Sequence, residues 1–180
     1  LDAPWKTIDL SRHIGTGSGL GIGVASPEDD LLAMTTDDGS EGLVYFPAQD
    51  KVLSTGPMRT VGSTNEPMIM PYSKHVIFAD MEGNVALFDL VNGNGKPERF
   101  TVKFSPRFIR TGWLESTWIL AGDKGIMFQS FKDPSDRKVV RFVPEVMNMW
   151  VTGDSKTALY TLDEGAPTIY RFDIRTREQL

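Results

Sequence analysis

Two histidines are the first residues to consider, because imidazole serves both acid–base catalysis and metal binding near neutral pH. His13 stands in a polar stretch beside Arg12, and His75 starts an apolar run. A two-histidine site requires a fold that brings these distant positions together. We favour a structural interpretation, with one exposed histidine and one at the start of a strand. We therefore expect no metal and no cofactor.

Neither the glycine-rich segment nor the serines predict a catalytic site. Residues 15–21 superficially resemble a phosphate-binding loop, but such loops open a helix whose amides hold the anion. Here the glycines lead into a predicted strand and no lysine follows. Ser18, Ser26 and Ser155 lack the Gly-x-Ser-x-Gly pattern of a strained nucleophile turn. We expect no catalytic residue in this chain.

Clustered carboxylates form the next candidate site, since calcium binds several oxygen ligands. Asp37 and Asp38 lie near Glu41, and Asp163 is followed by Glu164. Neither group has the spacing of an EF-hand loop. Both are typical of the tips of β-hairpins, and we prefer that interpretation.

The strongest candidate for a binding surface is a tryptophan with two arginines nearby. Trp113 follows a predicted strand at 107–111, where a loop would reach one face of the fold. Arg107 and Arg110 lie on that strand, and Trp and Arg are common in the centres of protein interfaces. We predict that Trp113, Arg110 and Arg107 form a partner-binding patch. Most other large side chains of the last two repeats should be core, among them Trp118, Trp150, Met147 and Met149.

Composition sets the class of protein in which these residues act. The 180 residues are 40% hydrophobic and 24% charged, which is ordinary for one folded domain. The net charge of −5 makes nucleic acid an unlikely partner. No apolar run approaches the roughly 20 residues of a membrane span. There is no cysteine, which excludes disulfides and thiolate chemistry, and the cellular compartment stays open.

A repeat of about 40 residues organises the whole chain, and such a period is typical of stacked β-units. The phenylalanines Phe46, Phe88, Phe131 and Phe172 close four apolar runs and lie 42, 43 and 41 residues apart. Each run follows a turn rich in acid and glycine, which favours a hairpin. The turn glycines Gly42, Gly83, Gly125 and Gly165 repeat at 41, 42 and 40.

Four strands fit into each repeat, which predicts the antiparallel blade of a β-propeller. We expect an all-β fold of four such blades, with first strands at a central channel and more charged fourth strands at the rim. The predicted blades span approximately residues 18–57, 62–104, 106–143 and 146–180 within a single unit. A β-sandwich with evenly spaced turns is the alternative. No helical stripe is apparent, so we do not expect an α/β fold.

The two ends of the chain leave the number of blades open. A strand at 4–10 could complete the last blade, and the chain would then be a self-contained four-bladed ring. Alternatively, the chain is a portion of a larger propeller, excised or completed by another chain. We favour the second interpretation, because the sequence starts at Leu1 rather than Met.

The phrases LVYFPAQDKVLST, VALFDLVNGNGKP and IYRFDIRTREQ resemble the third strand, loop and fourth strand of YVTN-type and WD40-like propeller repeats. The Gly-His and Trp-Asp pairs of WD40 repeats are absent. The resemblance implies a propeller fold and leaves the activity open.

Our leading hypothesis is a non-enzymatic binding or scaffolding module that presents loops on one propeller face to a protein partner. The main alternative is an enzyme or a small-molecule-binding propeller with its site at the channel mouth, where Asn148, Arg110 and Glu66 are the candidate polar groups. A carbohydrate-binding propeller is a third hypothesis. It requires an aromatic and a polar residue at equivalent places in every repeat, and the repeats do not show them.

Overall fold

Consecutive strands of the chain pair into four separate antiparallel sheets. The computed structural model describes residues 9–14, 19–26, 31–58, 68–69, 75–112, 117–141, 144–166 and 168–180. Blade 1 contains β1 (Leu20–Ser26), β2 (Leu31–Thr36), β3 (Glu41–Phe46) and β4 (Lys51–Pro57). Blade 2 contains β5 (Met68–Ile69), β6 (His75–Ala79), β7 (Asn84–Asp89) and β8 (Glu98–Thr101).

The second half of the chain repeats this order. Blade 3 contains β9 (Pro106–Gly112), β10 (Thr117–Gly122), β11 (Gly125–Ser130) and β12 (Arg137–Arg141). Blade 4 contains β13 (Val146–Val151), β14 (Thr157–Leu162), β15 (Ile169–Asp173) and β16 (Glu178–Gln179). Every sheet uses strands that are consecutive in sequence, whereas a sandwich typically returns distant strands to a shared sheet. The all-β, four-stranded blade prediction is confirmed.

The hairpins form where acid and glycine were noted in the sequence. In blade 2 the buried Asp80 carboxylate accepts hydrogen bonds from the backbone N–H groups of Glu82 (3.0 Å) and Asn84 (2.9 Å). Gly83 has φ of 86°, a left-handed conformation in which glycine is not strained. The aspartate and the glycine together close the turn between β6 and β7.

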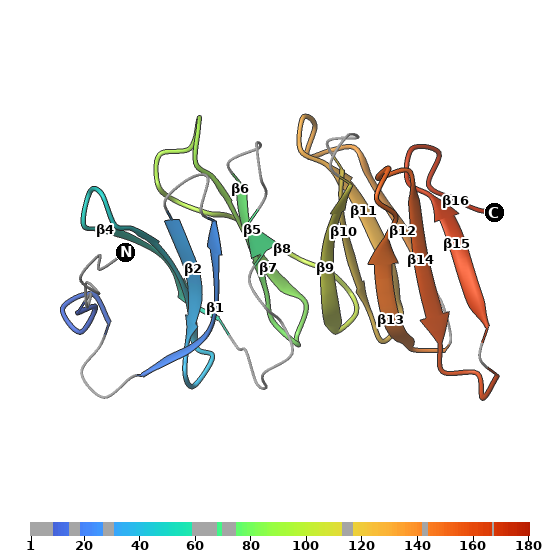
Figure 1. The fold of residues 1–180 in the computed structure, drawn as a ribbon, viewed down its shortest axis with the longest axis horizontal. Helices are drawn as coiled ribbons and strands as arrows, with labels where there is room; N and C mark the ends of the chain where they lie inside the picture. The colour runs from blue at the N-terminus through green and yellow to red at the C-terminus, as the bar shows by residue number, and fades with distance from the viewer. Residues whose placement is uncertain are drawn as a thin grey trace, which may run out of the picture.

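The four blades stand side by side in a row, with blades 1 and 4 at opposite ends (Figure 1). Among the described residues the row is therefore open, and the self-contained four-bladed ring does not form. Of the predicted strand at 4–10, residues 4–8 lie outside the described part. Leu10 packs against blade 1, at the opposite end of the row from the blade that this strand was expected to complete.

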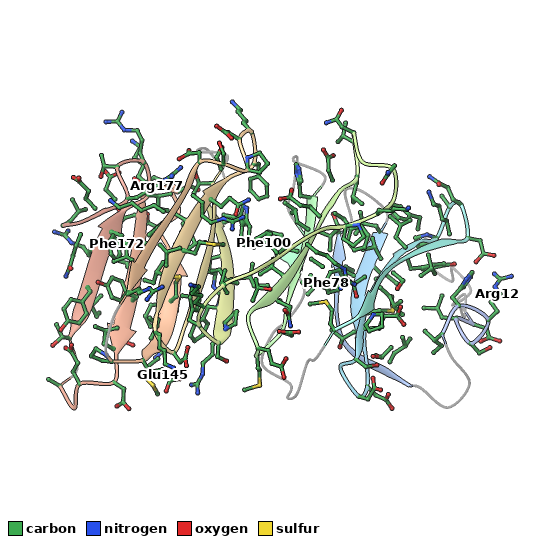
Figure 2. The ribbon with its side chains drawn as sticks, turned by 180° about the vertical axis from the view of Figure 1, so that it is seen from behind. Arg12, Phe78, Phe100, Glu145, Phe172 and Arg177 are labelled. Carbon is green, nitrogen blue, oxygen red and sulfur yellow. The ribbon has the colours of Figure 1, made fainter. Side chains whose placement is uncertain are left out.

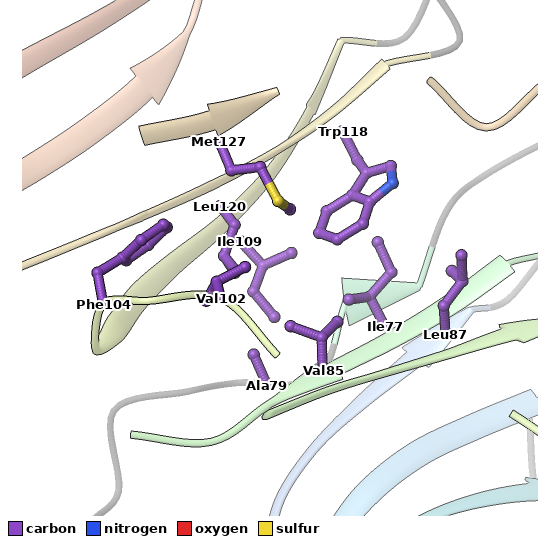
Figure 3. Close-up of a cluster of buried hydrophobic side chains, with 10 residues drawn as sticks. All are labelled: Ile77, Ala79, Val85, Leu87, Val102, Phe104, Ile109, Trp118, Leu120 and Met127. Atoms are coloured by element: carbon purple, nitrogen blue, oxygen red, sulfur yellow. The ribbon is translucent and has the colours of Figure 1, made fainter. Parts of the chain in front are cut away.

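Each blade has two faces, because successive residues of a strand point to opposite sides. In the middle strands the residues on both sides are mostly apolar. We call the side toward the following blade the forward face and the side toward the preceding blade the backward face. The forward face of blade 2 meets the backward face of blade 3 in a core that contains Ile77, Val85, Trp118 and Met127 (Figure 3). Equivalent cores join blade 1 to blade 2 and blade 3 to blade 4.

The strand faces show that the four periodic phenylalanines are not equivalent. Phe88 and Phe172 lie on backward faces, whereas Phe46 packs on the forward side of blade 1 and Phe131 follows β11. The residues that match Phe88 and Phe172 in the other blades are Tyr45 and Gln129. The structural repeat is present in all four blades. In blades 1 and 3, however, the periodic phenylalanine lies one or two residues after the equivalent structural position.

First strands of neighbouring blades contact each other, β1 with β5 and β9 with β13. These strands form the inner edge of the row. The fourth strands β8, β12 and β16 are mostly exposed, as expected for the rim.

Gly42 of blade 1 lies close to Phe78 of blade 2, and its substitution tests blade packing. A Cβ at this position would lie 2.5 Å from Cδ1 of Phe78. Gly42→Ala should lower the free energy of unfolding by about 1–3 kcal/mol, the usual cost of overpacking a core. Gly153→Ala is the matched control, because nothing lies within 4 Å of its added Cβ. Equal denaturant midpoints for the two variants would contradict this packing.

Tyr160 predicts a loss of stability in alkali. Burial in the core between blades 3 and 4 raises the pKa of Tyr160 to about 12. The unfolded phenol ionises above pH 10 and the folded one resists, so stability present below pH 10 is lost as the pH rises to 12. As the pH rises from 10 to 12, the free energy of unfolding should fall for both proteins. We expect the fall to be about 1–2 kcal/mol smaller for Tyr160→Phe than for the native chain. Urea unfolding at pH 9 and pH 11.5 measures the difference, and parallel losses would refute the assignment.

Candidate protein-interaction surface

The structure describes two of the three residues predicted for the patch, Arg107 and Arg110, both on β9. Trp113 lies outside the described residues. Arg107 and Arg110 both serve the joint between blades 3 and 4, where each makes a different contact.

Arg110 lies on the forward face of blade 3 and supports the next blade. Its Nε donates to the backbone carbonyl of Met149 at 3.2 Å, and its Nη1 donates to the carbonyl of Ile109 at 2.8 Å. Its guanidinium lies 5.6 Å from the centre of the Phe108 ring. The half-buried side chain is thus held within the blade joint.

Arg107 occupies a β-bulge at the start of β9. Gly122 pairs with Pro106 and Ala121 pairs with Phe108, which leaves Arg107 as the extra residue. A bulge redirects its side chain out of the regular alternation. The Nη2 atom of Arg107 lies 2.6 Å from Oε1 of Glu145, just before β13, and both side chains are partly exposed.

Blades 1 and 4 have a register shift at the same end of their first strands. In β13 the extra residue is Met147, between Val146 and Asn148, and 42% of Met147 is exposed. In β1 the shift lies between Leu20 and Gly23, and Leu20 is 45% exposed. Met147 was expected in the core, and the bulge explains why it is outside. Strand length could not have signalled this bulge, because β13 and its partner β14 both contain six residues.

All these bulges lie along the same edge of the row, at the starts of the first strands, and we call this edge the tip face. It consists of the starts of the first strands together with the turns between second and third strands, at 37–40, 80–83, 123–124 and 163–166. It forms the lower edge of Figure 2, where Glu145 is labelled, and Arg177 lies at the opposite edge. Met81 is 37% exposed in the second of these turns.

Carboxylates on the tip face mostly complete their own turns. Asp38 Oδ1 accepts hydrogen bonds from the Thr36 hydroxyl (2.7 Å) and from the Ser40 amide (3.0 Å). These bonds, the one from Thr36 foremost, lower the pKa of Asp38. Glu164 accepts a hydrogen bond from the hydroxyl group of Tyr170, and this bond raises the pKa of Tyr170. The hairpin interpretation therefore accounts for these acids.

The two histidines stand in unrelated surroundings. His13 Nε2 is 3.6 Å from Asp50 Oδ1 beside blade 1, whereas the His75 ring lies 4.8 Å from that of Phe131 at the joint of blades 2 and 3. Within the ranges that the structure describes, no three His, Asp or Glu residues are grouped as metal ligands. No helix in those ranges is long and apolar enough to cross a membrane.

Two of the three polar groups considered for the channel mouth lie in the described residues, and each has its own hydrogen-bond partner. Asn148 lies on the forward face of blade 4 and donates through Nδ2 to the Thr161 hydroxyl at 3.3 Å. Arg110 is held between blades, and Glu66 lies outside the described residues. Of the serines, Ser26 and Ser155 are buried, and Ser18 is also outside the described part.

The two arginines should differ in their effect on stability. Arg110→Met removes the donor to Met149 and should cost about 1–3 kcal/mol, because it leaves a joint carbonyl unpaired. Arg107→Met removes a partly exposed ion pair and should cost less than about 1 kcal/mol. Chemical unfolding of both variants measures this order, and a larger loss for Arg107 would reverse their assigned roles.

Comparison with known proteins agrees with the arrangement of the blades. No family model and no curated protein matches the sequence. Among solved structures, the chain is similar to the β-propeller domain of Cps50 (Swd1) from Myceliophteria thermophila, with a TM-score of 0.66 at 16% identity. The match covers 88% of this chain and 53% of that one, so the chain spans about half the length of the propeller it matches. The chain therefore has the β-propeller fold, represented here by four consecutive blades in an open row.

Proposed function

We propose that this chain is a protein-binding or scaffolding module whose partner docks on the tip face. The observation that carries the proposal is that three blades each place an exposed apolar side chain, Leu20, Met81 or Met147, along the tip face. Flexible methionines adapt to the shape of a partner. A surface assembled from several blades also offers more area than any single loop.

The charge of the tip face indicates the chemistry of the partner. Its turns carry Asp37, Asp38, Glu82, Asp163 and Glu164, and Lys124 is their one basic residue. An acidic surface around apolar contacts favours a partner segment with basic and apolar residues. Attraction between such exposed charges weakens with salt, so binding should be strongest at low ionic strength.

Arg107 belongs to this face and remains a proposed contact. Its partner Glu145 is also partly exposed, so a carboxylate of the docked protein can exchange with it at small cost. Arg110 connects blades 3 and 4 beneath this face. It would affect binding only by holding the two blades in position. Trp113 stays a prediction for a further contact.

Photo-crosslinking from single positions tests the proposal. A benzophenone amino acid at Met81 or at Met147 should label the same partner in the native cells. Val91 and Val139 are the matched controls, since both are apolar and more than 40% exposed but lie outside the tip face. We expect Met81→Asp and Met147→Asp each to weaken binding of the identified partner by roughly tenfold or more, as for central interface residues.

Two results would contradict the proposal. One is labelling of the partner from Val91 or Val139 as efficient as from the two methionines. The other is full affinity in both aspartate variants. Either result would move the interface away from the tip face.

A further inference from the structure

The two ends of the row expose different blade faces. On the forward face of blade 4, Trp150 pairs with Leu159, Leu159 pairs with Arg171, and Thr161 pairs with Ile169. Trp150 is 48% exposed and Ile169 is 64% exposed. Trp150 was expected in the core, and it is exposed because no sheet of the described chain covers this face.

Earlier blades bury the same positions completely. Leu159 occupies the place of Ile77 in blade 2 and Ile119 in blade 3, and both are fully buried. Ile169 matches Val85 and Ile126, which are also inaccessible to solvent. In each case the cover is the backward face of the next β-sheet. The forward face of blade 4 is therefore shaped for another backward face.

The register identifies what Arg171 would meet there. Arg171 stands at the place of Phe128 in blade 3, whose ring lies 5.4 Å from that of Phe172 on the backward face of blade 4. The residue of blade 1 that matches Phe172 is Tyr45. Its hydroxyl lies 3.2 Å from Oδ1 of Asp50. The carboxylate of Asp50 therefore lies where the guanidinium of Arg171 would be placed by docking of the two faces.

A short segment of the same chain now occupies this backward face of blade 1. Leu10 and Ile14 lie against Met34, Leu43 and Tyr45. In the same segment, Arg12 forms an ion pair with Asp50, a side chain that is 44% exposed. Arg12 fills the position that the register gives to the Arg171 of a preceding blade.

We propose that the forward face of blade 4 docks on the backward face of blade 1 in a second copy of this chain. Arg171 of one copy replaces Arg12 at Asp50 of the other, and residues 9–14 move aside. Contacts of this head-to-tail kind either close into a ring or grow without limit. The matched part of this chain covers 53% of the propeller it matches, so the matched parts of two copies together have about the length of one ring.

Mass measurement on the whole 180-residue chain tests the proposal. Sedimentation equilibrium should give twice 20.0 kDa at high concentration. Arg171→Glu and Asp50→Lys should each raise the dimer dissociation constant by at least about tenfold, and the double variant should restore dimerisation. Trp150→Lys should also dissociate the dimer, whereas Val91→Asp, outside both faces, should leave it unchanged. Circular dichroism confirms that each variant is folded.

Three outcomes would overturn the proposal. A monomer at every concentration shows that this face takes a different occupant. A dimer that survives Asp50→Lys shows that two blade 4 faces meet each other. Assemblies larger than two copies show that the contact does not close. None of these results bears on partner binding at the tip face.

Discussion

Packing of one sheet against the next is the interaction on which the rest of this structure depends. A four-stranded blade exposes apolar side chains on both faces, and an isolated sheet of this size has no core of its own. Ile119 and Met127 illustrate the point, since these neighbours in blade 3 point to opposite sides and both are fully buried. Each blade is therefore stable only as a member of a row.

This requirement fixes the middle strands and leaves the edges free. Strands β10 and β11 are buried along nearly their whole length, so their residues are committed to the core. Fewer residues in the turns and at the starts of the first strands are committed to the core. There the bulges at Arg107 and Met147 turn side chains outward without disturbing the sheet behind them. Buried middle strands with exposed residues along one edge are the arrangement on which the proposed binding surface rests.

The same requirement makes the ends of the row special. Blade 1 covers its backward face with residues 9–14, where Leu10 is nearly inaccessible to solvent. Blade 4 leaves Trp150 and Ile169 in contact with water. Exposure of this kind is costly, and a sheet packed on this face would remove that cost.

The repeat and the hairpins could be predicted from the sequence alone. The four turns rich in acid and glycine lie between paired strands, as predicted, because hairpin turns and period-two apolar runs are local properties. Burial and the bulges depend on the tertiary structure. A face is buried only if a neighbouring sheet covers it, which the residues of that strand do not encode. Trp118 and Trp150 look alike in the sequence, yet one lies between two blades and the other ends the row. The bulge at Arg107 and the place of Arg110 in the blade joint likewise depend on contacts between separate segments of the chain. The open arrangement of the four blades depends on such contacts too.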